Sequence, residues 1–263
     1  MDQFIKVSVY ILAGILGLCV GSFLNVVIYR VPKKMSLAKP SSHCTSCGYR
    51  LRWYDNIPVL SYLMLGGKCR KCRSHISIRY TIVELSNAVF WLLSVWLFWD
   101  YSIAFACVVA LTFSVLICIF FIDLEHMLIF NRFVAALLIL AIVASFVDGY
   151  ADFLDHLIGL VIGLGSFMIF YFGAIKILKK EGLGFGDVKL AAVAGLLLGW
   201  QRFILAMLIA SISASVVLLL LKAFRKDENG REYPFAPFIT VGMAVSMLFG
   251  SQIINWYIDL LVR

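Results

Sequence analysis

Long apolar segments constrain this chain more than any other feature of its sequence. A helix needs roughly 20 apolar residues to cross the hydrocarbon core of a membrane. Apolar residues make up 62% of the chain and charged residues only 14%, a composition that excludes a water-soluble domain of this size. We therefore predict an all-α polytopic membrane protein with about eight transmembrane helices, of which the fourth and sixth are short. The segments cover residues 7–29, 82–99, 102–122, 133–147, 156–178, 188–200, 203–221 and 237–258.

The charged residues between these segments predict how the chain crosses the membrane. Loops 30–81, 123–132, 179–187 and 222–236, with their flanks, hold 20 of the 23 Lys and Arg residues. Because basic loops stay in the cytoplasm, we expect both termini outside and these four loops inside. Residues 7–29 are too long for a cleaved signal peptide and are expected to form the first helix. The net charge of +8 then reflects orientation in membrane lipid, and no nucleic-acid partner is expected.

Two CxxC pairs lie in the first basic loop, 30–81. Cys44 and Cys47 are separated from Cys69 and Cys72 by 21 residues, which is near the spacing of a four-cysteine zinc site. A disulfide is disfavoured because the loop is expected in a reducing compartment, while a thiol–disulfide relay and plain free thiols are the other readings. The loop is too small for a sufficient apolar core, so bound metal would supply much of its stability.

Two aspartates lie at the ends of apolar segments. Asp123 follows the third segment directly, and Asp187 lies before the sixth in a turn with Gly184 and Gly186. Acids near lipid are costly and therefore candidates for function. Although 64 positions separate them, both are expected at the cytoplasmic side at similar depth, so the two side chains can meet. The glycines would permit unusual backbone angles and the close approach of a substrate strand.

Two neighbouring carboxyl groups cannot both ionise easily, so the pair would hold an acid and a base at once. Such a pair suits peptide hydrolysis, with the base activating water and the acid protonating the substrate. Because Asp187 begins a helix and Asp123 ends one, helix dipoles predict a charged Asp187 and a neutral Asp123. The structural alternative is an Asp123 that pairs with Arg132 or Lys189 and an Asp187 that is only an N-cap.

Together these features resemble the bacterial type IV prepilin peptidases, which are membrane aspartyl proteases of the GxGD type. The resemblance covers nearly the whole chain. It departs from the family at Thr45, Thr81 and Phe130, where proline is common, and Phe130 bears on the turn after Asp123. The matching motifs are residues 21–32, both CxxC pairs, residues 56–63, Asp123, residues 184–190 and the Pro237-Phe238 pair.

The resemblance implies an enzyme that cuts the basic leader from prepilins or pseudopilins at the inner membrane, with Asp123 and Asp187 as catalytic residues. It also implies N-methylation of the new N-terminus with S-adenosylmethionine, an activity that accompanies the four-cysteine loop in this family. The expected parts are a first helix over 1–29, a zinc module over 30–81 and a protease core over 82–263. No residues for the methyl donor can be named from the sequence.

Three other functions are compatible with parts of the sequence. An ion-coupled transporter would also hold acids in a membrane, but it would place them near the centre of the bilayer and often shows inverted repeats. A membrane redox enzyme would use the cysteines, which lie on the wrong side for that role. A scaffold with a zinc module would leave the two aspartates unexplained.

Overall fold

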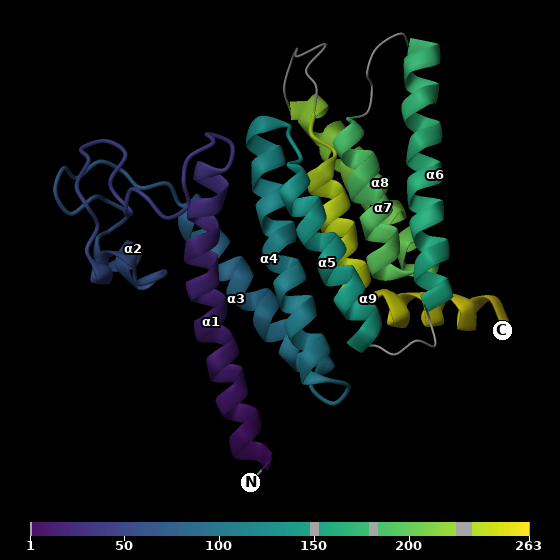
Figure 1. The fold of residues 1–263 in the computed structure, drawn as a ribbon, viewed down its shortest axis with the longest axis horizontal. Helices are drawn as coiled ribbons and strands as arrows, with labels where there is room; N and C mark the ends of the chain where they lie inside the picture. Colours follow the sequence, from purple (N-terminus) through teal and green to yellow (C-terminus); the bar gives the residue numbers. More distant parts are fainter. Residues whose placement is uncertain (1, 148–152, 179–183, 225–232, 263) are drawn as a thin grey trace. The chain divides into compact units, whose positions relative to one another are not determined.

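The computed structural model describes residues 2–147, 153–178, 184–224 and 233–262, and in these it is helical (Figure 1). No β-strand occurs among the described residues, and two isolated bridges in the cysteine loop are the sole extended pairings there. The prediction of an all-α fold is confirmed. The helices are α1 (Asp2–Arg30), η1 (Trp53–Asn56), α2 (Leu60–Met64), α3 (Arg79–Phe98), α4 (Ile103–His126), α5 (Asn131–Val147), α6 (Phe153–Leu178), α7 (Phe185–Leu198), α8 (Trp200–Phe224) and α9 (Ala236–Val262).

Eight of these helices correspond to the eight predicted segments, but they differ in length. Within the described ranges, six are long and apolar enough to cross a membrane, namely α1, α3, α4, α6, α8 and α9. α5 has 17 residues and α7 has 14, which at 1.5 Å per residue gives α7 a length of about 21 Å. Gly199 ends α7 with a φ of 76°, a left-handed conformation that glycine adopts without strain. α8 then begins at Trp200, earlier than expected.

The chain forms two compact units, Met1–Cys118 and Ile119–Arg263. The cysteine loop belongs to the first unit, and both aspartates belong to the second. The division into parts at residues 29 and 81 that the sequence suggests remains a prediction.

Close helix packing in the first unit depends on small residues of α1. A Cβ atom on Gly17 would lie 2.8 Å from the Cα of Ala88, and one on Gly21 would lie 2.7 Å from the Cα of Glu84. Only glycine therefore allows α1 and α3 to approach this closely. At the same place the amide of Asn87 donates to the carbonyl oxygen of Gly17 over 2.7 Å, which fixes the pair in register.

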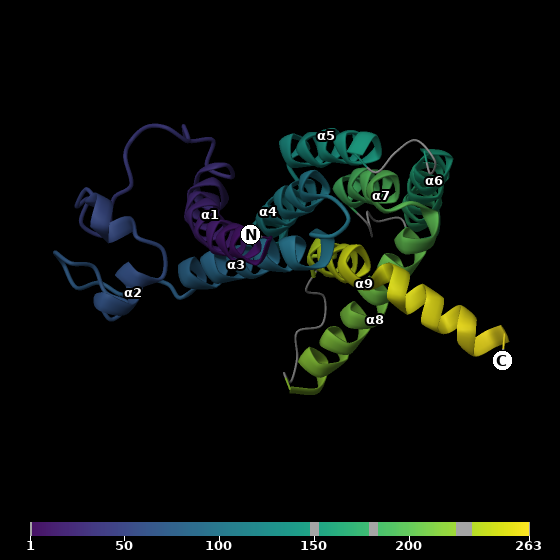
Figure 2. The same cartoon turned by 90° about the horizontal axis from the view of Figure 1, so that it is seen from below.

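In the second unit α7 occupies the centre and contacts α5, α6, α8 and α9 (Figure 2). Its contact with α6 is made by backbone against backbone. A Cβ atom on either Gly159 or Gly195 would collide with the carbonyl of the other, and one on Gly163 would collide with the carbonyl of Ala191. These glycines therefore allow the backbones of α6 and α7 to touch. The short helix α7, which begins with the Asp187 turn, is thereby held rigidly at the centre of its unit.

Candidate functional site

Asp123 lies in the last turn of α4, which continues past the predicted end at residue 122 and reaches His126. Its side chain is buried, with 5% of the residue exposed. One neighbour comes from the distant end of the chain, because the backbone N–H of Ala236 donates to the Asp123 carboxylate. Ala236 is the first residue of α9, so this acid lies against the N-terminus of a helix.

Asp187 lies in the first turn of α7 and is 9% exposed. The N-cap of this helix is Gly184, whose backbone N–H donates to the Asp187 carboxylate, while the N–H of Asp187 donates to the carbonyl of Gly184 over 3.0 Å. The reading of Asp187 as an N-cap is therefore wrong, although its side chain does reach back to the cap in the manner of a capping box.

Gly184 and Gly186 are not in this turn because of their backbone angles. Neither has a positive φ, since the glycines of that kind among the described residues are Gly48, Gly66, Gly67 and Gly199. The expectation of unusual backbone angles at Gly184 and Gly186 is wrong. At Gly186 a Cβ atom would lie 3.0 Å from the Cβ of Ile129, so the space for a side chain is already taken. This glycine allows the start of α7 to lie directly against the segment that follows α4.

The two aspartates act on each other, because the charge of Asp123 repels charge on Asp187. Neither carboxylate forms an ion pair with a cation of the described residues. The candidate partners are engaged elsewhere: Lys189 donates to Asn131 over 2.9 Å, and the guanidinium of Arg132 lies over the Phe130 ring. The alternative in which Asp123 pairs with Lys189 or Arg132 is therefore not what the structure contains.

Helix dipoles separate the two acids less than the sequence predicts. Asp123 lies in the last turn of α4 and Asp187 in the first turn of α7, as expected. However, the N–H of Ala236 brings the N-terminus of α9 against Asp123, and a helix N-terminus favours a negative charge. Each acid thus has one helix N-terminus and one backbone N–H, so the two acids are best treated as one unit that shares its proton.

The four cysteines of the loop come together in the first unit. The sulfur atoms of Cys44, Cys47, Cys69 and Cys72 all lie within 4.8 Å of one another, and those of Cys44 and Cys72 are 3.8 Å apart. Four sulfurs placed tetrahedrally about 2.3 Å from a zinc ion would be roughly 3.8 Å apart. The cluster therefore fits a metal ion of this size, and it can hold one without rearrangement of the fold.

Both CxxC pairs use the same backbone turn. The first cysteine accepts from the N–H four residues later and donates to the carbonyl five residues later, at Cys44 and again at Cys69. The residue after each pair, Gly48 or Arg73, has a φ of 68° or 59°. Burial raises the pKa of Cys44, but the N–H groups of Cys47 and Ser46 donate to its sulfur and lower it to about 6.

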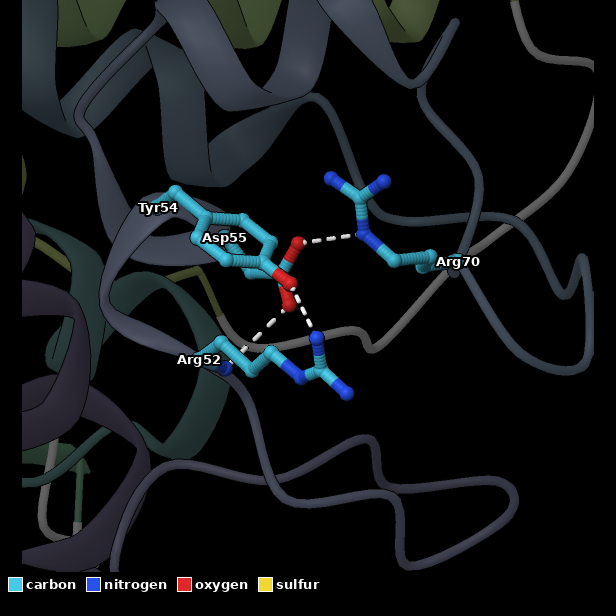
Figure 3. A network of polar contacts seen from close by, with 4 residues as sticks. All are labelled: Arg52, Tyr54, Asp55 and Arg70. Atoms are coloured by element: carbon cyan, nitrogen blue, oxygen red, sulfur yellow. Dashed lines mark hydrogen bonds and ion pairs between the residues drawn. The ribbon is translucent and has the colours of Figure 1, made fainter.

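A polar network holds the segment between the pairs against the second pair (Figure 3). Arg70, inside the second pair, donates to Asp55 over 2.7 Å, and the N–H of Arg52 donates to the other carboxylate oxygen over 3.2 Å. Arg52 also donates to the hydroxyl of Tyr54 over 2.6 Å. Burial alone would raise the pKa of Asp55, but the hydrogen bonds from Arg70 and Arg52 outweigh it and hold the pKa below its ordinary value.

Two contacts in and around the site could not be expected from the sequence. The donor to Asp123 is a backbone group, so the identity of Ala236 carries no signal for it. Glu84, whose role the sequence leaves open, accepts from the N–H of Val59 over 2.8 Å. Val59 has a positive φ of 61°, so Glu84 fixes a strained turn that joins the cysteine loop to α3.

Comparisons with known proteins cover both units. Residues 15–98 match the model of the bacterial Peptidase A24 N-terminal domain, and residues 110–219 match the model of the type IV leader peptidase family. A prepilin leader peptidase/N-methyltransferase of Pseudomonas putida is 35% identical over 92% of this chain and 91% of its own length. Its counterpart in Pseudomonas aeruginosa is 34% identical over 93% and 92%.

The Myxococcus xanthus protein of the same name is 38% identical over 84% of this chain and 67% of its own. No solved structure matches the chain significantly. The relatives extend over both aspartates and all four cysteines in one continuous match. The chain belongs to the type IV leader peptidase family.

Proposed function

We propose that this protein removes the basic leader peptide from prepilins or pseudopilins at the cytoplasmic face of the inner membrane, with Asp123 and Asp187 as the catalytic pair. One observation carries the assignment of the pair: two buried carboxylates interact with each other and have no cation of the described residues to neutralise them. Burying such a pair costs stability. A protein that keeps such a pair despite its cost in stability is expected to use the shared proton in its function.

The proposed reaction uses the pair as base and acid in turn. One carboxylate takes a proton from water while the water oxygen bonds to the carbonyl carbon at the end of the leader, and the other carboxyl protonates the carbonyl oxygen. A hydroxyl group of the resulting tetrahedral intermediate then returns a proton to the carboxylate that had protonated the carbonyl oxygen. The other acid gives its proton to the peptide nitrogen, the C–N bond breaks, and a carboxylic acid and a free amine leave.

The position of the pair supports a substrate that lies partly in the membrane. Asp123 is in the last turn of one helix and Asp187 in the first turn of another, at the ends that adjoin the basic loops. Because Lys and Arg concentrate in those loops, we propose that the loops are cytoplasmic and that both termini are outside. A prepilin offers a basic leader in the cytosol and an apolar helix in lipid. Its scissile bond therefore lies at the depth of the two acids.

We further propose zinc for the cysteine cluster and N-methylation of the new N-terminus with S-adenosylmethionine as donor. Zinc is supported by four cysteine sulfurs that lie within 4.8 Å of one another, because four cysteines are a ligand set that structural zinc prefers. Its contribution is to hold the two CxxC turns together. Methylation is supported by the double name of the relatives, which are called prepilin leader peptidase/N-methyltransferase.

A cleavage assay with a prepilin-like substrate tests the catalytic pair. The full chain in detergent is compared with Asp123→Asn and Asp187→Asn, which keep the side-chain volume and remove the proton exchange. Loss of general acid–base catalysis predicts a fall in kcat of about 10³-fold or more for each variant. Asp259→Asn is the matched control, because Asp259 is an exposed acid in the last turns of α9.

The same assay separates the two activities by mass spectrometry of the product. A free amine with one added methyl group supports both, and a free amine alone leaves cleavage only. Wild-type protein that leaves the substrate intact would rule out the peptidase proposal. Full activity in either asparagine variant would rule out the pair.

A further inference from the structure

A groove lined by apolar side chains lies between α6 and α8 of the second unit. It has a volume of about 550 Å³ and none of the described residues that line it is charged. α6 and α8 lie together near the start of α8 and diverge towards its C-terminal end (Figures 1 and 2). The lining residues are Ile162, Ser166, Phe167, Phe170 and Ala174 of α6, Phe203, Ile204, Met207, Leu208 and Ser211 of α8, and Phe235.

The two helices that form this groove are poorly covered by the rest of the protein. Only 17% of the most apolar stretch is buried in α6 and in α8, against 39% in α1 and α3, 44% in α9 and 67% in α4. An apolar surface in lipid can remain uncovered without cost, so low burial by itself indicates no partner. What distinguishes this surface is that it is hollowed and that Phe235, one of its lining residues, directly precedes the residue that donates to Asp123.

Residues next to the walls of the groove contact the candidate site. Phe235 lines it, and the next residue, Ala236, donates its backbone N–H to the Asp123 carboxylate. On the α6 side, the ring of Tyr171 lies 5.7 Å from that of Phe185, two residues before Asp187. Asp123 is therefore connected to the lining of the groove through Ala236 and Phe235. Asp187 is connected to α6, which forms one wall, through the contact of Phe185 with Tyr171.

The dimensions and the side chains suit a helix. Along α6 the lining runs from Ile162 to Ala174, which at 1.5 Å per residue is about 18 Å and therefore more than half of the hydrocarbon core. Small residues stand on both walls, Ser166 and Ala174 on one and Ser211 on the other. Small residues of this kind let a second helix approach closely in a membrane, and serine hydroxyls can bond across the contact.

We propose that this groove docks the apolar helix of the substrate, with the end of that helix that carries the scissile bond beside Phe235 and Ala236. The inference rests on the proposed peptidase function, because that function requires an apolar helix to reach Asp123 and Asp187 from lipid. The groove then sets which bond is cut: the length of helix seated between α6 and α8 fixes the position of the peptide bond relative to the acids.

Photo-crosslinking in lipid nanodiscs tests the occupant. Benzoylphenylalanine replaces Ile204 in the groove, or Leu219 as the control, which is exposed on the same helix outside the groove. Both proteins also carry Asp187→Asn, so that a tagged prepilin-like substrate stays uncleaved. We expect a substrate adduct from position 204, with little from position 219. Equal yields, an adduct with a second copy of the chain, or lipid adducts alone would overturn the proposal.

Kinetics give an independent readout in protein that retains both aspartates. Ser211→Trp fills the groove, whereas Leu219→Trp adds the same side chain outside it. Loss of a buried apolar contact predicts a rise in KM of about tenfold for Ser211→Trp, with kcat close to that of wild type, and an unchanged KM for Leu219→Trp. Equal KM values in the two variants would contradict the proposed docking of substrate in the groove and leave the peptidase proposal intact. Wild-type protein that cannot cleave the substrate at all would contradict the peptidase proposal.

Discussion

The cysteine loop and the site at the helix ends both contain buried aspartate, but the partners of the carboxylate differ between them. Asp55 in the loop is 8% exposed, close to the 5% of Asp123 and the 9% of Asp187. Asp55 is neutralised by Arg70 and held by the N–H of Arg52 (Figure 3). Asp123 and Asp187 receive one backbone N–H each, the charge of Asp123 repels charge on Asp187, and no cation of the described residues pairs with either.

This contrast shows that burial alone does not separate a structural acid from a candidate catalyst. A buried carboxylate with an Arg partner lowers the energy of the fold relative to one without it, because the charge stays solvated by the guanidinium. A buried pair without a cation raises the energy of the fold, because the two carboxyl groups cannot both carry their charge at low cost. The partners of each acid therefore carry the functional information. Four experiments test what holds each of these two regions together and which of the acids serve activity.

Metal removal should have the largest effect, and it acts on the loop alone. A chelator, or Cys44→Ser, is expected to unfold the two CxxC turns, because apparent binding energies of structural zinc in small domains are about 10–16 kcal/mol. Hydrogen exchange of the backbone N–H groups of Cys69 and Arg73 should become fast while that of α7 stays slow. Equal protection with and without metal would mean that the loop is held by its hydrogen bonds.

Replacement of both site acids should separate stability from activity. In Asp123→Asn/Asp187→Asn the buried charge and the repulsion are gone, so the thermal unfolding temperature in detergent should stay equal or rise. Cleavage should fall by about 10³-fold or more. A marked loss of stability would show that these acids are structural in the way that Asp55 is.

The rigidity of the α6–α7 contact can be tested with two glycines of one helix. A Cβ atom on Gly159 would collide with the carbonyl of Gly195, whereas around Gly165 there is open space. Gly159→Ala is expected to destabilise the protein by about 1–3 kcal/mol through overpacking, and Gly165→Ala to be neutral or slightly stabilising. Thermal unfolding in detergent measures both. Equal changes would mean that the backbones are not in contact.

Asp55→Asn should produce the smallest effect, and it should act opposite to the site variants. Loss of the charged hydrogen bond to the half-exposed Arg70 is expected to cost about 1–2 kcal/mol in the loop, with cleavage near that of wild type. Because the pKa of Asp55 is lowered in the fold, this stabilisation is complete above its ordinary pKa of about 3.9 and is lost as pH falls through the lower value in the fold. Hydrogen exchange in the loop against pH measures it.

The features that the sequence predicts correctly are those with a local pattern. Apolar length placed the helices, and the CxxC spacing predicted one cluster of four sulfurs. Each of these depends on neighbours within one segment or on a repeated chemical motif. The prediction of an unusual backbone angle at Gly186 was wrong. The need for glycine there comes from Ile129, which lies more than 50 positions away in the chain.

The sequence by itself determined an all-helical membrane protein, two CxxC pairs that could share one metal site and two acids at helix ends, because apolar length, residue chemistry and charge are properties of the chain. Only the tertiary structure decided which acids of the described residues pair with a cation, that Ala236 at the start of α9 donates to Asp123, and that the preceding Phe235 lines a groove between α6 and α8. These depend on ion pairs, on backbone groups and on empty space. All three arise when separate segments pack, and no local pattern of residues encodes them.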